Sequence, residues 1–229
     1  MCGVYGFVAR GNHDPDLVQL KRITKTTMSR GPHAFGFAWL DHQGRLKSYK
    51  QEGRIVDHLG LLNMARDARL LIGHCRFATH GSVRDNINNH PHPVDGGWLV
   101  HNGMINEYRD IVKYRGLFMN SQCDSEVLSL LFEQASGSLV DRTRAAVNTT
   151  KRSPLVMLGL WKHPRRLIAV RRGNPLFMGE EQHGYYLGSL SDDLPGDVFE
   201  LGDDWVFEFH SGRGAGFESY NLKTGQAWT

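Results

Sequence analysis

Met1-Cys2-Gly3-Val4-Tyr5-Gly6 opens the chain and places a cysteine at the second position. Because the residue after Met1 is small, we expect Met1 to be removed, which would give Cys2 a free α-amino group. Such an amine has a pKa of about 7.7–8.0, so near pH 7 a fraction of it is neutral and can accept the thiol proton. The run therefore indicates an activated N-terminal nucleophile or, alternatively, an apolar cysteine buried at the start of a strand.

The composition is that of an ordinary globular protein: of 229 residues, 40% are apolar and 22% are charged. This length suits one domain with a sizeable core, and no linker interrupts it, so we expect a single domain over residues 1–229 with no synthase domain. The net charge is only +3. The chain has no Lys/Arg block of five or more residues, which argues against nucleic acid as a partner.

The cellular setting is predicted from what the sequence lacks. No apolar run approaches the ~20 residues that a membrane helix needs, so we expect no membrane contact. The first residues do not form a secretory signal. The three cysteines (Cys2, Cys75 and Cys123) form no disulfide framework. These features favour the reducing environment of the cytoplasm.

Hydrophobic patterning predicts an α+β fold, with strands before and after a helical middle. Strands are expected at residues 4–9, 35–40, 45–49, 70–76, 98–101, 154–161, 167–171, 175–178, 184–188, 205–210 and 217–221. Helices are expected at residues 16–29, 56–66, 106–114, 125–134 and 139–149, with Asp124 or Ser125 as the N-cap of the fourth. The polar stretch 80–97 is expected to be a long functional loop.

Histidines are concentrated in one part of the chain: five of the twelve lie between His74 and His101. A zinc site is one interpretation. The spacings match no common structural zinc pattern, however, and the pair His90 and His92 has no carboxylate near it in the sequence. We therefore predict no metal and no cofactor, and keep a metal-binding protein built on these histidines as a rival hypothesis.

The alternative interpretation of this region is a pocket for a polar amino acid. Arg76 could bind an α-carboxylate through its planar guanidinium, and Asp124 could bind an α-ammonium group. Asn102 and the backbone N–H of Gly103 could stabilise a developing oxyanion. Each residue also has an ordinary structural interpretation, since Arg76 could be a surface cation, Asp124 a helix cap and Asn102-Gly103 a turn. Their occurrence together with Cys2 favours the pocket.

Taken jointly, the segments resemble class II glutamine amidotransferase domains of the N-terminal-nucleophile hydrolase family, and are most similar to the glutaminase domain of glucosamine-6-phosphate synthase. The resemblance covers nearly the whole chain in the family's order. The matching segments are residues 2–6, 30–36, 73–81, 90–92, 100–108 and 123–127, with a weaker match at 169–176.

The resemblance implies a four-layer αββα sandwich of two antiparallel sheets, and it implies roles for catalytic residues. Cys2 would be the nucleophile, with its own amine as the base. Asn102 and Gly103 would form the oxyanion hole. The substrate would be L-glutamine, and the products would be glutamate and ammonia.

The resemblance also implies residues that bind the amino-acid head of glutamine. Arg76 would bind the α-carboxylate, with Thr79 and His80 lining the same end of the pocket. Asp124 would bind the α-ammonium group. Phe77 stands where the synthase has tryptophan, so an indole N–H contact would be lost while the apolar wall is kept.

Two further residues are expected to support the site. Arg30 would order the surroundings of the nucleophile, and His90 matches a histidine of the loop beside the pocket. The chain departs from the family pattern where Cys75 replaces threonine, and where Arg30-Gly31 continues as Pro-His-Ala-Phe-Gly instead of the usual Asp-Ser-Ala/Ser-Gly form.

Class II domains usually precede a synthase domain that consumes the ammonia, and this sequence contains none. The ammonia acceptor would then be a separate synthase. Two rivals are a stand-alone amidase that acts on a γ-glutamyl or other amide, and a non-catalytic glutamine-binding module. The sequence predicts no particular oligomeric state.

Overall fold

A computed structural model of the chain describes residues 2–150 and 153–228. Its first sheet has seven strands in the order β11-β9-β10-β1-β4-β2-β3, and every neighbouring pair is antiparallel. These strands are β1 (Gly3–Ala9), β2 (Ala34–Asp41), β3 (Leu46–Glu52), β4 (Ala68–Arg76), β9 (Phe177–Glu181), β10 (Gly184–Gly188) and β11 (Val198–Glu200). The expected removal of Met1 lies outside the described residues.

The second sheet has six antiparallel strands in the order β13-β12-β8-β7-β6-β5. They are β5 (His92–Val94), β6 (Gly97–Gly103), β7 (Leu155–Trp161), β8 (Arg166–Arg172), β12 (Trp205–His210) and β13 (Gly216–Asn221). The two sheets stack face to face, and their inner faces enclose one apolar core that includes Val4, Val8, Leu158 and Leu160.

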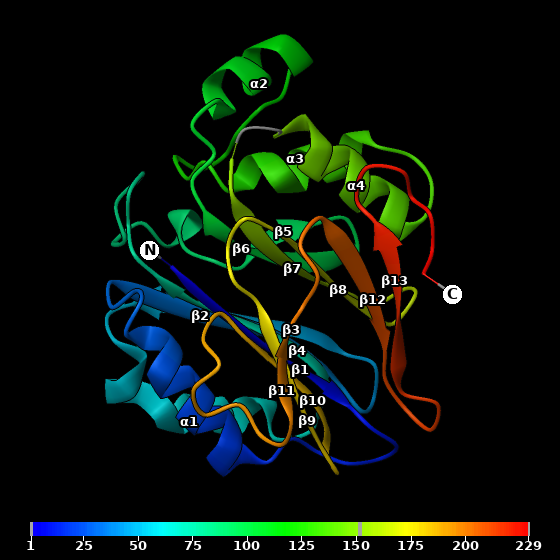
Figure 1. The fold of residues 1–229 in the computed structure, drawn as a ribbon. Coiled ribbons are helices and arrows are strands. Elements are labelled where there is room, and N and C mark those ends of the chain that lie inside the picture. The colour runs from blue at the N-terminus through cyan, green and yellow to red at the C-terminus, as the bar shows by residue number, and fades with distance from the viewer. Residues whose placement is uncertain (1, 151–152, 229) are drawn as a thin grey trace.

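Helices cover the outer face of each sheet (Figure 1). The helix α1 (Leu17–Met28) and the 3₁₀ segment η1 (Ile55–Ala65) pack on the first sheet. The helices α3 (Glu126–Gln134) and α4 (Leu139–Thr149) pack on the second, and α2 (Tyr108–Arg115) contacts α3. A short 3₁₀ turn, η2, spans Asn86–Asn88. The layers are therefore αββα, which confirms the expected four-layer sandwich.

Strand β1 shows how the sequence specifies these layers. Successive side chains of a strand point to opposite faces of its sheet. Val4 and Val8 lie in the core between the sheets, while Tyr5 and Phe7 lie in the core beneath α1. All four are at most 1% exposed. Because burying such a side chain contributes about 1.5–3 kcal/mol, β1 is held firmly from both sides.

The structure corrects three details of the sequence-based expectations. Residues 55–65 form a 3₁₀ segment with a kink at His58 instead of an α-helix. The stretch 80–97 contains η2 and β5, so it is not a loop throughout. Strand β11 was not expected. Of the two residues expected at the N-cap of α3, Ser125 occupies that position, although its side chain makes no capping hydrogen bond.

Across the described ranges 2–150 and 153–228, no helix has the length and apolar character needed to cross a bilayer.

Candidate active site

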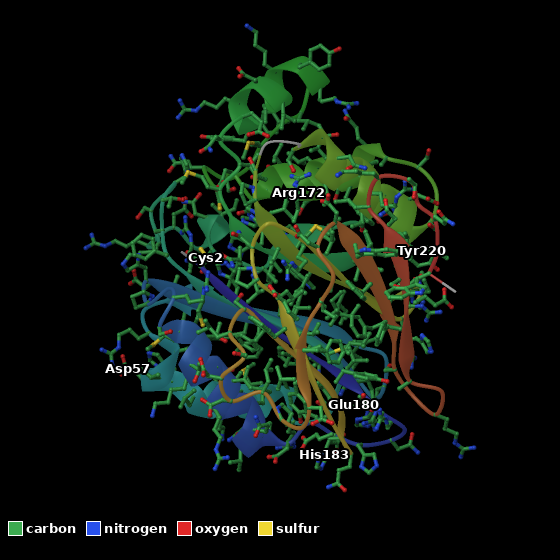
Figure 2. All side chains as sticks on the ribbon, in the orientation of Figure 1. Cys2, Asp57, Arg172, Glu180, His183 and Tyr220 are labelled. Carbon is green, nitrogen blue, oxygen red and sulfur yellow. The ribbon has the colours of Figure 1, made fainter. Side chains whose placement is uncertain are left out.

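Cys2 directly precedes β1, and β1 lies between β4 and β10 in the first sheet (Figure 2). Because β1 and β4 are antiparallel, with Gly3 opposite Cys75, the start of β1 meets the loop that follows β4. The backbone N–H of Phe77 donates to the Cys2 sulfur at 3.3 Å, and the thiol donates to the Phe77 carbonyl at 3.5 Å. Arg30 Nε donates to the Cys2 carbonyl at 2.9 Å. The loop that follows β4 and the Arg30 side chain therefore both hold the cysteine in position.

Glycine follows the cysteine because α1 passes too close for a side chain. A Cβ atom at Gly3 would lie 2.5 Å from the Thr27 methyl carbon and 2.7 Å from the Thr27 carbonyl oxygen. Contacts this short force the helix or the strand to move. The Cys-Gly pair is thus explained by packing as well as by chemistry.

The Cys2 thiol is half-buried, and burial raises its pKa, although the hydrogen bond from the Phe77 backbone acts in the opposite direction. A thiol in this environment stays protonated near neutral pH, and the thiolate is the reactive form. Nucleophilic attack by Cys2 therefore needs a base beside the sulfur.

Asn102 lies near the end of β6 and is fully buried. Neither its side-chain oxygen nor its side-chain nitrogen has a hydrogen-bond partner among the described residues. Its backbone carbonyl accepts a hydrogen bond from Asn174 Nδ2 at 3.0 Å. Since buried side-chain amides are normally paired, this amide is available to a ligand in the pocket that it lines.

Gly103 follows Asn102 and pairs with Leu155 of β7. A Cβ atom at this position would lie 2.6 Å from His101 Nε2 and 2.6 Å from the Pro154 carbonyl oxygen. Only glycine fits without displacing these neighbours. The close approach explains why Asn-Gly ends this strand instead of forming the reverse turn that the pair can also indicate.

These residues share a pocket of about 380 Å³ that reaches the surface. Five of its lining residues were expected to form the site: Cys2, Phe77, Thr79, Asn102 and Gly103. Four others, Met104, Asn106, Pro154 and Asn174, were not expected. Met104 follows the Asn-Gly pair directly and Asn106 lies two residues further on, so both could have been inferred from that position. Pro154 and Asn174 come from distant parts of the chain. Asn174 lies in the weaker matching segment 169–176, whereas Pro154 gave no local signal.

Arg76 does not line this pocket. Its side chain is buried behind the loop that follows β4, where it donates to Asn89 Oδ1 at 2.7 Å and to the Gly81 carbonyl at 3.2 Å. It also donates to the His80 carbonyl. The guanidinium therefore organises this loop in the structure. Its expected contact with a substrate carboxylate stays a prediction.

Asp124 and His80 lie together, also outside the pocket lining. Asp124 is buried, its Oδ2 accepts a hydrogen bond from the Ile105 backbone at 2.7 Å, and its Oδ1 lies 3.8 Å from His80 Nδ1. Ile105 is two residues beyond Gly103. The carboxylate is thus joined through the backbone to the segment that carries the unpaired amide.

His90 is buried against other histidines and not in the pocket wall. Its ring stacks on His74 with a centroid distance of 3.9 Å and meets the edge of His92 at 4.6 Å. Burial, more than the neighbouring cations, lowers its pKa well below the ordinary value, so the ring is neutral near pH 7.

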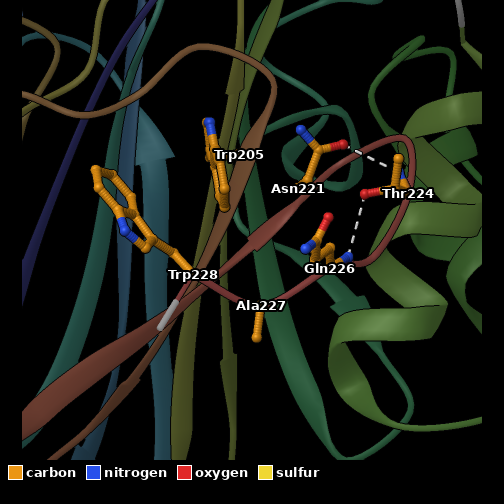
Figure 3. Close-up of a pocket in the computed structure, with 6 residues that line it drawn as sticks. All are labelled: Trp205, Asn221, Thr224, Gln226, Ala227 and Trp228. Carbon is orange, nitrogen blue, oxygen red and sulfur yellow. Dashed lines mark hydrogen bonds between the residues drawn. The ribbon is translucent and has the colours of Figure 1, made fainter.

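A second hollow lies beside the C-terminal hairpin (Figure 3). Its lining residues are Trp205, Asn221, Thr224, Gln226, Ala227 and Trp228. This set contains no cysteine, histidine or carboxylate, and its polar groups are largely bonded to one another, as in the hydrogen bonds from Thr224 N to Asn221 Oδ1 and from Gln226 N to Thr224 Oγ1. The hollow has no group for acid–base or nucleophilic chemistry.

Comparison with known sequences finds glutamine–fructose-6-phosphate aminotransferases. The enzyme from Clostridium perfringens is 32% identical over 202 residues, which cover 85% of this chain and 32% of that protein. The enzyme from Thermotoga maritima is 33% identical over 236 residues, covering 96% of this chain and 37% of that protein. The chain thus spans about a third of the length of these relatives. No protein-family model matches.

Comparison with solved structures supports the fold. A glutamine phosphoribosylpyrophosphate amidotransferase from B. subtilis superimposes with a TM-score of 0.79 at 21% identity, over 97% of this chain and 50% of that one. A glutamine aminotransferase class-II domain protein from Silicibacter pomeroyi gives a TM-score of 0.64 at 15% identity, over 94% of this chain and 98% of that one. The sequence similarity and the fold together are those of a class II glutamine amidotransferase domain.

Proposed function

We propose that the chain hydrolyses the side-chain amide of L-glutamine through Cys2 and releases glutamate and ammonia. One observation carries this proposal: a half-buried thiol and the unpaired amide of Asn102 line the same pocket. A nucleophile and an oxyanion donor that face one cavity are the two requirements of acyl transfer. The sequence relatives, which are named as glutamine-dependent enzymes, agree with this substrate.

The proposed reaction begins once removal of Met1 has freed the Cys2 amine. The amine takes the thiol proton, and the sulfur attacks the glutamine amide carbon. Asn102 Nδ2 and the Gly103 N–H stabilise the oxyanion. When the tetrahedral intermediate collapses, the protonated amine gives its proton to the NH₂ group of the former amide, which leaves as NH₃, and a γ-glutamyl thioester is left.

Water completes the cycle. The neutral amine removes a proton from the water molecule that attacks the thioester, and the same oxyanion donors stabilise the second intermediate. The carbon–sulfur bond then breaks, the sulfur recovers its proton, and glutamate leaves. The sum is glutamine plus water giving glutamate plus ammonia, with the enzyme unchanged.

Recognition of the amino-acid head is assigned to the charged residues beside the pocket. Asp124 binds the α-ammonium group, and Arg76 binds the α-carboxylate with Thr79 and His80. Arg76 is held by loop carbonyls and Asn89, and His80 lies beside Asp124. Glutamine therefore binds after the loop that carries His80 moves away from Asp124. Phe77 forms an apolar wall of the pocket.

We further propose that residues 1–229 act as one cytoplasmic domain, and that a separate synthase consumes the ammonia. The relatives carry about twice as much additional sequence beyond the region that this chain matches. Their names describe transfer of nitrogen to a sugar phosphate.

The activity is tested by measuring ammonia and glutamate released from glutamine by the purified chain, with Cys2→Ala as the comparison. We expect release by the wild type and loss in the variant. Covalent labelling of Cys2 by a diazo-ketone analogue of glutamine should occur in the wild type only. Equal release by the Cys2→Ala variant would refute the proposal. Faster turnover of asparagine or γ-glutamyl amides than of glutamine would favour a stand-alone amidase.

A further inference from the structure

Three potential metal ligands meet behind the pocket. His90, His92 and Cys123 each offer one ligand atom, and these atoms lie within 4.8 Å of one another. The residues are 2%, 1% and 3% exposed. None of them lines the pocket of Cys2. The cluster is thus separate from the proposed chemistry, and the 30 residues between His92 and Cys123 in the sequence explain why spacing gave no zinc pattern.

The imidazoles of this cluster have unpaired nitrogens. Within the described part of the chain, neither nitrogen of His90 has a hydrogen-bond partner, nor has His92 Nε2. Buried polar atoms are normally paired, and each one left unpaired costs about 1–3 kcal/mol. Several unpaired nitrogens beside a buried thiol therefore point to a bound group that interacts with these atoms.

The types of ligand atom in the cluster indicate which metal ion would bind. Two imidazoles and a thiolate suit zinc, whereas magnesium and calcium prefer oxygen ligands. A neutral imidazole and a thiolate are the forms that ligate metal, so the Cys123 thiol must lose its proton when a metal binds.

The charges around the cluster also bear on metal binding. The Lys50 ammonium donates to the Asn89 and Pro91 carbonyls at 2.7 and 3.0 Å, so a cation is fixed beside the segment that carries both histidines. A bare dication would be repelled by this ammonium. The negative charge of a Cys123 thiolate, together with neighbouring Asp124, offsets that repulsion.

We propose that His90, His92 and Cys123 form a buried zinc site. Zinc replaces the Cys123 thiol proton, which is released, and bonds to one nitrogen of each imidazole. The fourth coordination position of the zinc ion is taken by water or by a neighbouring group that moves slightly toward the ion. The site joins residues 90–92, at the start of β5, to the segment before α3, and so connects Asn89, which holds Arg76, with Asp124. Its role is structural, and it does not depend on the proposed glutaminase activity.

The test uses the full chain, stripped with a chelator and titrated with Zn²⁺ or with Co²⁺ as a spectroscopic probe. We expect one metal per chain, a sulfur-to-cobalt charge-transfer band, proton release on binding, and a higher thermal unfolding temperature with zinc. Loss of a group that only supports a metal ligand typically weakens metal binding by about 10- to 100-fold. Cys123→Ser and His92→Gln remove ligands themselves, so each should weaken zinc binding by more than that. Cys75→Ser is the control, because Cys75 is also buried but lies outside the cluster.

Absence of stoichiometric binding by the wild type would overturn the proposal. So would cobalt binding without a charge-transfer band, or a band that Cys123→Ser leaves unchanged. Because the band and the metal content are measured on the wild-type chain, the proposal can be refuted even if a variant fails to fold. Binding of copper with exclusion of zinc would also refute it. Glutamine hydrolysis is measured separately, so failure of one proposal does not imply failure of the other.

Discussion

The backbone N–H of Phe77 donates a hydrogen bond to the sulfur of Cys2 at 3.3 Å. This contact joins the first strand of the chain to the loop that follows β4, 75 residues later. Because a hydrogen bond to sulfur favours its charged form, the loop partly offsets the burial that raises the thiol pKa. Loop position and nucleophile reactivity are therefore coupled, and several consequences of the site geometry can be measured.

Replacing Asn102 with alanine should leave glutamine binding nearly unchanged but reduce turnover. Loss of one oxyanion donor typically costs about 2.7–4 kcal/mol, which corresponds to a 10²–10³-fold fall in kcat. Steady-state kinetics of ammonia release would measure the effect. Asn148→Ala is a suitable control, since Asn148 lies in α4, outside the pocket lining, and its side chain donates a hydrogen bond to the Leu222 carbonyl. A fall in kcat of less than tenfold would remove Asn102 from the role.

Replacing Gly103 with alanine should reduce both activity and stability. The new Cβ would lie 2.6 Å from His101 Nε2 and from the Pro154 carbonyl oxygen, so β6 and β7 would have to separate at the pocket. Overpacking of this kind costs about 1–3 kcal/mol. Chemical denaturation and kinetics together would measure it. Gly60→Ala is the matched control, because nothing lies within 4 Å of a Cβ there. An unchanged Gly103→Ala protein would show that the strand relaxes freely.

The active chain should begin at Cys2. Intact-mass spectrometry should find a mass lower than that of the full sequence by one methionine residue. The reason is chemical: while Met1 is attached, the Cys2 nitrogen belongs to a peptide bond and cannot accept a proton. A fully active preparation in which every molecule keeps Met1 would contradict the amine as the base.

Replacing Asp124 with asparagine should raise KM for glutamine more than it lowers kcat. The amide oxygen can still accept the hydrogen bond from Ile105, but the charge that attracts the ammonium group is lost. Loss of a hydrogen bond to a charged group costs about 1.5–3 kcal/mol, or roughly 10- to 100-fold in KM. Kinetics over a range of glutamine concentrations would separate the two parameters. An unchanged KM would place the ammonium group elsewhere.

Asp41 should make the stability of the fold depend on pH. Burial alone would raise the pKa of this carboxyl, but hydrogen bonds from Lys47 and Arg45 outweigh it and hold the pKa well below its usual range. The stabilisation is complete above the unfolded pKa of about 3.9 and is lost as pH falls through the folded value.

Asp41→Asn should therefore lower the free energy of unfolding by about 1.5–3 kcal/mol at pH 7, and this difference should shrink below about pH 4. Denaturant titrations at several pH values would measure it. Asp57→Asn is the control, because Asp57 and its partner Arg54 are both 57% exposed, and surface pairs contribute little. A difference that does not change with pH would rule out the charge as its cause.

Much of the fold could be predicted because strand patterning is local. Val4 and Tyr5 belong to opposite faces of one strand, and the alternation is visible in the sequence. Strand β11 could not be predicted because all three of its residues are exposed and it depends on pairing with β9. The kink at His58 within residues 55–65 likewise could not be predicted, because the apolar spacing of this segment is compatible with a continuous helix.

Part of the candidate site could likewise be predicted from the sequence, and part could not. Asn102 and Gly103 could be proposed from their order in the chain, but the pairing of Asn174 with the Asn102 carbonyl joins residues 72 positions apart. Asp124 or Ser125 was expected at the N-cap of α3, and Ser125 occupies that position, but its hydroxyl is hydrogen-bonded to His101 Nδ1 at 2.8 Å and not to the helix backbone. The partner of the Ser125 hydroxyl depends on which residues lie beside it in the folded chain. A local sequence pattern does not contain this information.

The position of Cys2 at the very start of β1 has a practical consequence for expression. An affinity tag fused ahead of Met1 would prevent aminopeptidase trimming and would keep the reactive residue inside a longer polypeptide. Preparations purified through such a tag would be folded yet silent in an ammonia assay. A removable C-terminal tag, or a leading tag whose protease leaves cysteine as the first residue, avoids this false negative.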